Sequence, residues 1–239
     1  MTTGSKRTVG EWVTERPSRS RVFERFGIDY CCGGKQPLDA ACSKAGHALN
    51  DVLEALDESD ACSAGEEDVD WSQGKMTDLI DHIVSTHHAY LRRELPRLEA
   101  MGAKVVAAHG DRHPEVVTCQ EVFTSLRAEL ESHMDKEEQI LFPMIKSLDG
   151  AESVPQFHCG GIENPIAGLE DEHDNAARAL RKLRALTHGY EPPDEACNTY
   201  RAWLDGLHEV EADMHRHVHK ENNILFPQAI HAQAASVNH

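Results

Sequence analysis

A histidine followed four residues later by a glutamate occurs twice in this sequence, within two related segments. His133–Pro143 reads HMDKEEQILFP, and His217–Pro227 reads HVHKENNILFP. Residues four apart lie on the same face of an α-helix, so each segment presents an imidazole and a carboxylate, from Glu137 or Glu221, in one direction. Nitrogen and oxygen donors placed in this way suit a transition metal such as iron. The repeat therefore predicts metal binding.

The helices that would position these residues can be read from the spacing of apolar side chains. Four long stretches have apolar residues at intervals of three and four, which is typical of helices that bury one face. They cover about 75–101, 115–147, 165–187 and 193–232. Each stretch carries one histidine within its apolar stripe, and these are His88, His133, His173 and His217. The pattern predicts an antiparallel four-helix bundle in which Pro143 and Pro227 kink or restart their helices.

Burial of these histidines has a simpler explanation that must be weighed. A single histidine on an apolar stripe is more often a hydrogen-bonded core residue than a metal ligand. That explanation weakens when four histidines occupy equivalent positions, and it does not account for Glu137 and Glu221. A buried ionised carboxylate is very costly unless it is paired or bound to metal, and two that face each other raise one another's pKa. Bound cations remove both problems.

The number of donors indicates two metal ions. Four imidazoles and two carboxylates are more than one tetrahedral zinc ion can use. Two octahedral ions that share both carboxylates and an oxo or hydroxo bridge would each keep an open position, which a small diatomic molecule such as nitric oxide or dioxygen could occupy. Ligand type alone would also permit manganese or a mixed pair. The donor count therefore predicts a carboxylate-bridged di-iron site.

A smaller unit precedes the bundle. Residues 1–58 are predicted to form a small helical domain, residues 59–74 an acidic linker, and residues 75–239 the bundle. The small domain contains two adjacent cysteines, Cys31 and Cys32. These could be small buried residues, but a thiolate beside two glycines and a lysine would be stabilised and reactive. We therefore consider both thiols candidates for iron transfer, redox chemistry or contact with a client protein.

The amino-acid composition limits the kinds of partner that the protein can bind and indicates its cellular compartment. The chain of 239 residues has 41 acidic and 24 basic side chains and a net charge of −17, which disfavours binding to nucleic acid and to anionic membranes. No apolar run approaches the roughly 20 residues of a membrane helix, and the first residues lack a signal-peptide core. The seven cysteines lack the spacing of a disulfide framework. We expect reduced thiols and a cytoplasmic protein.

Taken together, the two halves of the sequence resemble a known family, the iron–sulfur cluster repair di-iron proteins (repair of iron centres family) of the hemerythrin-like superfamily. The resemblance covers nearly the whole chain and rests on Asp29–Gln36 (DYCCGGKQ), Ile80–Ile83 (IDHI), Glu137–Pro143 and Glu221–Pro227. It implies an all-α fold, an antiparallel hemerythrin-like four-helix bundle preceded by a small helical domain. It also implies two iron ions per chain, bridged by carboxylates and an oxo group. The implied ligands are His88, His133, Glu137, His173, His217 and Glu221, with Glu129 and Glu172 as acidic residues near the site.

The resemblance also implies a function in the stress response. The family restores iron–sulfur clusters damaged by nitric oxide or peroxide, so damaged iron–sulfur proteins are the expected clients, and iron donation or nitric oxide handling the expected activity. Oxygen-carrying hemerythrins have a histidine where this chain has Ala177, and His-x4-Asp where it has His217 and Glu221, which argues against reversible oxygen transport.

Two other functions stay open on the sequence. One is an enzyme that reduces nitric oxide at the di-iron site, and the other is a binding module that senses oxygen or nitric oxide. Whether the protein is an enzyme is likewise open, as is its oligomeric state, for which a homodimer is one candidate. We assign no role to Gln156–Gly161 (QFHCGG), which includes Cys159 and is expected to be a loop.

Overall fold

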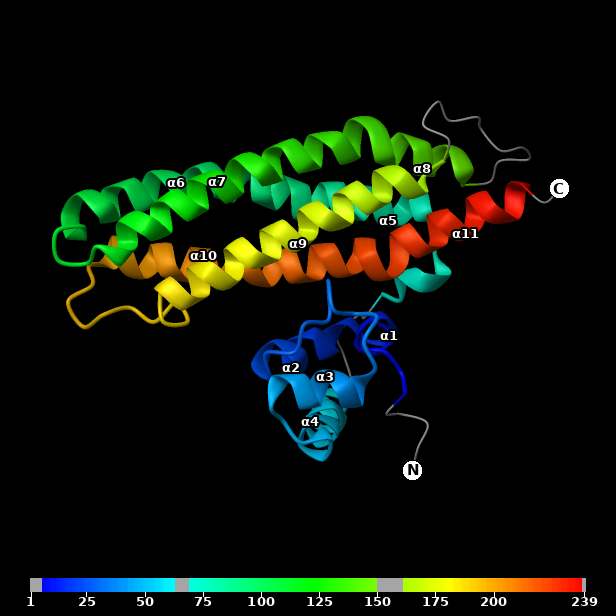
Figure 1. Cartoon of the computed structure of the whole chain (residues 1–239), viewed down its shortest axis with the longest axis horizontal. Coiled ribbons are helices and arrows are strands. Elements are labelled where there is room, and N and C mark those ends of the chain that lie inside the picture. Colours follow the sequence, from blue (N-terminus) through cyan, green and yellow to red (C-terminus); the bar gives the residue numbers. More distant parts are fainter. Residues whose placement is uncertain (1–5, 63–68, 150–160, 238–239) are drawn as a thin grey trace. The chain divides into compact units, whose positions relative to one another are not determined.

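The computed structural model describes residues 6–62, 69–149 and 161–237 of the chain (Figure 1). Within these ranges the regular structure is helical, without a β-strand, and only an isolated antiparallel bridge joins Thr8 and Pro37. The all-α class expected from the sequence is confirmed. Part of the expected linker and most of the segment around Cys159 lie outside the described residues.

Contacts along the chain define two compact units. One contains residues 81–144 and 163–214, and the other contains residues 1–80, 145–162 and 215–239. The second of these combines the N-terminal residues with the last helical segments of the chain. In the described ranges, no helix is both long and apolar enough to cross a bilayer.

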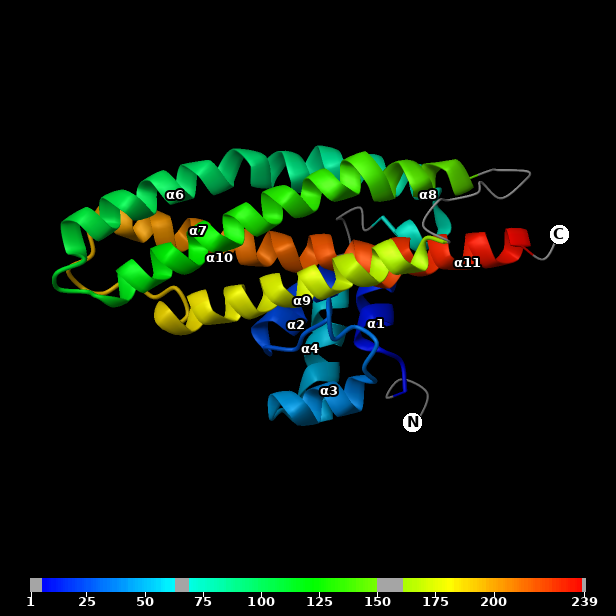
Figure 2. The ribbon, with the colours of Figure 1, turned by 45° about the horizontal axis from the view of Figure 1, so that its top comes forward.

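Four long helices form the unit of residues 81–144 and 163–214. They are α6 (Ala89–His109), α7 (Glu115–Lys136), α9 (Glu163–Leu186) and α10 (Asn198–Lys220), of which the unit takes the part up to Met214. α7 packs against both α6 and α9, and successive helices run in opposite directions (Figures 1 and 2). Fully buried side chains such as Leu95, Phe123 and Trp203 fill the space between them. Burial of these apolar stripes is the main force that holds the helices together.

A π-helical segment interrupts three of the predicted helices. These segments are η3 (Val84–His88), η4 (Glu137–Leu141) and η5 (Glu221–Leu225), and they join α5 (Met76–Ile83), α8 (Phe142–Leu148) and α11 (Phe226–Val237) to the long helices. The Phe142 amide donates to the Glu137 carbonyl, five residues back, and Phe226 does the same to Glu221. Pro143 and Pro227 follow directly and lack the amide that an uninterrupted α-helix requires. Both helices therefore restart at the prolines, as expected, and each restart directly follows a π-turn.

The N-terminal residues form short helices around a core of their own. These are α1 (Val9–Glu15), η1 (Pro17–Arg19), α2 (Ser20–Arg25), α3 (Leu38–Ala45) and α4 (Leu49–Cys62), followed by η2 (Trp71–Gln73). A capping box between Thr8 and Glu11 fixes the start of α1. Phe23, Leu38 and Leu56 are at most 1% exposed and belong to one hydrophobic cluster.

Two helix boundaries differ from the sequence prediction. The first long helix was expected to end near residue 101, but α6 continues to His109. The fourth long helix was expected from residue 193, but α10 begins at Asn198. The Arg201 guanidinium donates to the backbone carbonyls of Pro193, Asp194 and Ala196, which holds this segment in a turn before the helix. Side-chain capping of this kind is not visible in apolar periodicity.

Candidate metal centre

All six side chains expected to bind metal lie in the protein interior. His88, His173 and His217 are 1% exposed and His133 is 2% exposed, while Glu137 and Glu221 have no exposed surface. Three of the six lie at π-turns: His88 ends η3, and the two glutamates begin η4 and η5. π-turns occur frequently at functional sites because the additional residue redirects side chains.

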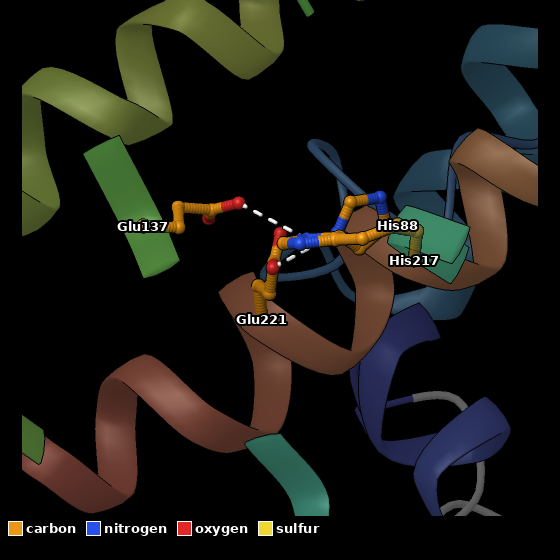
Figure 3. Close-up of side chains that lie close together, drawn as sticks. All are labelled: His88, Glu137, His217 and Glu221. Atoms are coloured by element: carbon orange, nitrogen blue, oxygen red, sulfur yellow. Dashed lines mark hydrogen bonds and ion pairs between the residues drawn. The ribbon is translucent and has the colours of Figure 1, made fainter. Parts of the chain in front are cut away.

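The six side chains form two groups, in each of which the donor atoms lie within 4.8 Å of one another. One group contains His88 and His217, and the other contains His133 and His173. Both groups contain Glu137 and Glu221. Figure 3 shows the first group, with both carboxylates directed toward the imidazoles.

Within the groups, ring nitrogens face carboxylate oxygens. Glu137 Oε2 lies 3.3 Å from His88 Nε2, and its Oε1 lies 3.4 Å from His133 Nε2. Glu221 Oε1 lies 3.0 Å from His217 Nε2. His173 Nε2 lies 3.0 Å from His133 Nε2. The Nε2 atoms and the carboxylates are therefore directed toward common points.

The other nitrogen of two of these imidazoles contacts a further carboxylate. His88 Nδ1 lies 2.8 Å from Glu138 Oε1, and His133 Nδ1 lies 2.9 Å from Glu172 Oε2, so each Nδ1–H donates to a carboxylate. In a neutral imidazole this leaves a lone pair on Nε2, which faces the lone pairs of Glu137. A cation between them would turn this repulsion into coordination, so the donor set fits a metal ion.

Basic side chains hold both of these outer carboxylates in place. Arg92 Nη2 lies 3.0 Å from Glu138 Oε1, and Lys136 forms an ion pair with Glu172. Burial by itself raises the pKa of a carboxyl group, but hydrogen bonds from the basic residue and the histidine lower the pKa of both Glu138 and Glu172 overall. Both carboxylates therefore stay ionised and orient the imidazoles.

A cavity of about 450 Å³ between α7 and α9 leads to one of the two groups. His133 and His173 line it, together with Glu129, Glu172 and Lys136. The Glu129 carboxylate accepts a hydrogen bond from the Ser125 hydroxyl at 3.2 Å. The cavity gives small molecules or cations a route to the imidazoles of this group.

Sequence reasoning did not anticipate the roles of Glu138, Arg92 and Lys136. Glu138 adjoins a ligand-type residue, but its counterpart in the second repeat is Asn222, so the repeat did not point to it. A second buried pair was also missed: His87 Nδ1 lies 2.9 Å from Asp213 Oδ1. The one signal in the sequence for the role of Glu138 was its position directly after Glu137.

The outer carboxylates give a first prediction. Glu138→Ala or Glu172→Ala is expected to weaken iron binding by about 10- to 100-fold, because the imidazole loses the group that fixes its tautomer and orientation. Asp174→Ala, an exposed acid beside His173, serves as the matched control and should have no effect. Competition for iron with a chelator measures the change. Equal retention in all three variants would show that the outer carboxylates do not support the site.

The adjacent cysteines differ from each other in environment. Cys31 is 5% exposed, whereas Cys32 is partly exposed. Asp29 Oδ1 accepts the amides of Cys31 and Gly33 at 3.1 and 3.0 Å and lies 3.3 Å from Cys31 Sγ. The hydrogen bond with the Cys32 thiol, burial and the Asp29 carboxylate raise the pKa of the Cys31 thiol well above its usual range. Cys31 therefore favours the protonated thiol, in contrast to the stabilised thiolate expected from Lys35 and the glycines.

This difference predicts the order in which the two thiols react. Because alkylation requires the thiolate and access, iodoacetamide at neutral pH should modify Cys32 before Cys31. Buried Cys42 and Cys119 are internal controls and should stay unmodified while the fold is intact. Peptide mass spectrometry over time distinguishes the four sites. Modification of Cys31 ahead of Cys32 would contradict the environments described here.

Comparison with known proteins supports the assignment made from these residues. Residues 79–229 match the family model described as the hemerythrin HHE cation binding domain, and residues 5–60 match a domain of unknown function, DUF542. The iron-sulfur cluster repair protein YtfE of Escherichia coli O81 (strain ED1a) is 37% identical over 224 residues, which cover 93% of this chain and 96% of that protein. The proteins of the same name from Escherichia fergusonii and Escherichia coli O127:H6 are each 36% identical over the same shares. The resemblance stated from the sequence is thereby confirmed, and the chain belongs to the hemerythrin HHE cation-binding family, in the group of the YtfE iron–sulfur cluster repair proteins.

Proposed function

We propose that this chain is a di-iron protein that repairs iron–sulfur clusters damaged by nitrosative or oxidative stress, and that it does so by donating iron. The observation that carries this proposal is the presence of both buried glutamates in both groups of donor atoms. The relatives named iron-sulfur cluster repair protein support the biological role.

The proposed iron pair is held by two histidines for each ion. His88 and His217 would bind one ion, His133 and His173 the other, and Glu137 and Glu221 would bridge the two. Carboxylate bridging accounts for two buried acids in one place, because each oxygen can then face a different cation. When bound, the pair would supply transferable iron and a binding position for a small diatomic molecule.

The cavity between α7 and α9 supports exchange of iron with the outside. It reaches His133 and His173, and Glu129 and Glu172 place carboxylates along its wall. Carboxylate oxygens attract iron cations more weakly than the complete ligand set does, so they suit temporary contacts during release. Lys136 neutralises part of this charge through its ion pair with Glu172, which keeps that carboxylate directed at His133.

The clients would be damaged iron–sulfur proteins in the cytoplasm. In the described part of the chain, Cys31, Cys32, Cys42, Cys119 and Cys197 are free thiols, which suits a reducing compartment. Cys32 is partly exposed and would be available to a client or to iron in transfer, whereas Cys31 is buried beside it.

Transfer of labelled iron tests the proposal directly. The full chain is loaded with isotopically enriched iron and mixed with an iron–sulfur enzyme that nitric oxide has damaged. Client activity and the isotope content of the client cluster are then measured. Donation predicts that activity and label appear together, and that metal-free protein restores neither. Recovery of activity without label in the cluster would show that iron is not donated.

Nitric oxide reduction is a second candidate, favoured by the cavity that opens onto His133 and His173. A diatomic molecule could enter there while the remaining donors stay buried. Repeated consumption of nitric oxide in the presence of an electron donor, without loss of iron from the protein, would favour reduction over donation.

A further inference from the structure

We propose that Asn223 is a positioning residue that fastens the Cys31–Cys32 turn to η5, the π-turn that begins with Glu221, and thereby limits the reactivity of Cys31. The partners belong to one compact unit, which contains residues 1–80 and 215–239. The link between thiol reactivity and iron rests on the proposed function, because it requires metal at Glu221. The fastening itself does not.

Hydrogen bonds join the middle of η5 and the last turn of α10 to the backbone of the cysteine turn. Asn223 Nδ2 donates to the carbonyl of Cys31 at 3.0 Å and to that of Tyr30 at 3.3 Å. His219 Nδ1 lies 3.3 Å from the same Tyr30 carbonyl. Two side chains on successive turns thus hold two consecutive peptide groups at the start of the cysteine motif.

The glycines of the motif leave room for the Asn223 side chain. A Cβ atom at Gly34 would lie 2.3 Å from Asn223 Oδ1, and one at Gly10 would lie 2.7 Å from the same oxygen. The Gly10 amide donates to the Gly34 carbonyl at 2.8 Å, so the two glycines lie side by side against the Asn223 side chain. The close approach that Gly34 permits is therefore used by a side chain of the same protein.

Aromatic packing adds to this fastening. The Tyr30 ring is 1% exposed and contacts the His219 and His215 rings at centroid distances of 5.6 and 6.1 Å. Its hydroxyl donates to Glu24 at 2.8 Å, which anchors the ring on the N-terminal side. Release of Asn223 would therefore loosen the turn at Cys31 without dissolving the core of the small domain.

The repeat shows that this contact is specific to the second copy. Asn223 and His219 correspond to Gln139 and Asp135 in the first copy, and both of those are exposed. The first copy instead has Glu138 in contact with His88, where the second copy has Asn222. The two copies keep the His-x3-Glu pair and use the differing positions for different partners, an outer carboxylate in one and the cysteine turn in the other.

The fastening lies close to the proposed metal ligands. Asn223 is two residues after Glu221 within the same five-residue π-turn. Metal bound at Glu221 would restrain η5 and, with it, the side chain that holds Cys31. By linkage, conditions that hold the turn closed should favour retention of iron, and loss of iron should make Cys31 easier to modify.

Alkylation of the full chain tests the fastening. Metal-free and iron-loaded proteins are treated with iodoacetamide, and modification at each cysteine is followed by mass spectrometry. Asn223→Ala and the nearly isosteric Asn223→Asp both remove the donor, so each should speed modification of Cys31 by about fivefold or more, as expected for the loss of one or two hydrogen bonds that hold a local segment closed. Gln139→Ala, at the matching position of the first copy, should leave the rate unchanged.

Buried Cys42, in the core of the small domain, shows whether that domain stays folded. An unchanged Cys31 rate in both Asn223 variants would overturn the proposal, as would an equal rise at Cys42, because Asn223 would then act only on stability. Iron should slow Cys31 modification in the wild type and have less effect in Asn223→Asp; equal slowing in both would overturn the link to the metal. If the wild-type protein binds no iron and Asn223→Asp still speeds modification of Cys31, the proposed function is refuted and the fastening stands.

Discussion

Glu137→Gln is expected to remove both metal ions from the protein, and Glu221→Gln is expected to do the same. Each glutamate belongs to both groups of donor atoms, so one substitution weakens both positions. Glutamine keeps the size of the side chain but loses the charge that a cation requires. The affinity for iron should fall by more than the roughly 10- to 100-fold that loss of an outer carboxylate causes. Elemental analysis after purification without added metal measures the loss.

Substitution of one histidine should have a smaller effect than this. His88 belongs to only one group, so His88→Ala should reduce iron content in part. His208→Ala is the control, because His208 is exposed and stacks on Tyr190, with ring centroids 5.4 Å apart. If all these variants retained as much iron as the wild type, the six residues would not be the ligands.

Replacement of both Cys31 and Cys32 by serine is expected to leave iron content unchanged and to reduce client repair by about tenfold or more, since a hydroxyl does not replace a thiolate as nucleophile or iron ligand. The buried histidines and glutamates can hold the proposed iron pair without thiols. Reactivation of a nitric-oxide-damaged iron–sulfur enzyme measures repair, and elemental analysis measures iron.

Single substitutions make this test sharper. Cys32→Ser should have most of the effect, because Cys32 is the more accessible thiol, and Cys42→Ser is a control within the same small domain. Full repair by the double variant would exclude the thiols from the reaction. Loss of iron from it would instead identify them as ligands.

The fold could be predicted from the sequence because periodicity reports which face of a helix is buried. The stripes through His88, His133, His173 and His217 lie on helices that the structure buries, and the prolines at 143 and 227 indicated where two helices restart. The repeated His-x3-Glu spacing placed both carboxylates with the imidazoles. These are local properties, and a single sequence contains them.

The surroundings of the site could not be predicted in the same way. A π-turn adds a residue to the helical turn, so the 3.6-residue period no longer indicates which side chains point inward after Glu137 or Glu221. Glu138 and Asn223 lie in these turns, and their roles were missed for that reason. The contact between Asn223 and Cys31 also joins positions far apart in the chain, about which helical periodicity carries no information.

The most direct test of the central claim is elemental analysis combined with Mössbauer spectroscopy of the full chain, purified without added metal. Sharing of Glu137 and Glu221 by two groups of donors predicts about two iron ions per chain, present as one magnetically coupled pair. One zinc ion per chain and no iron would contradict it.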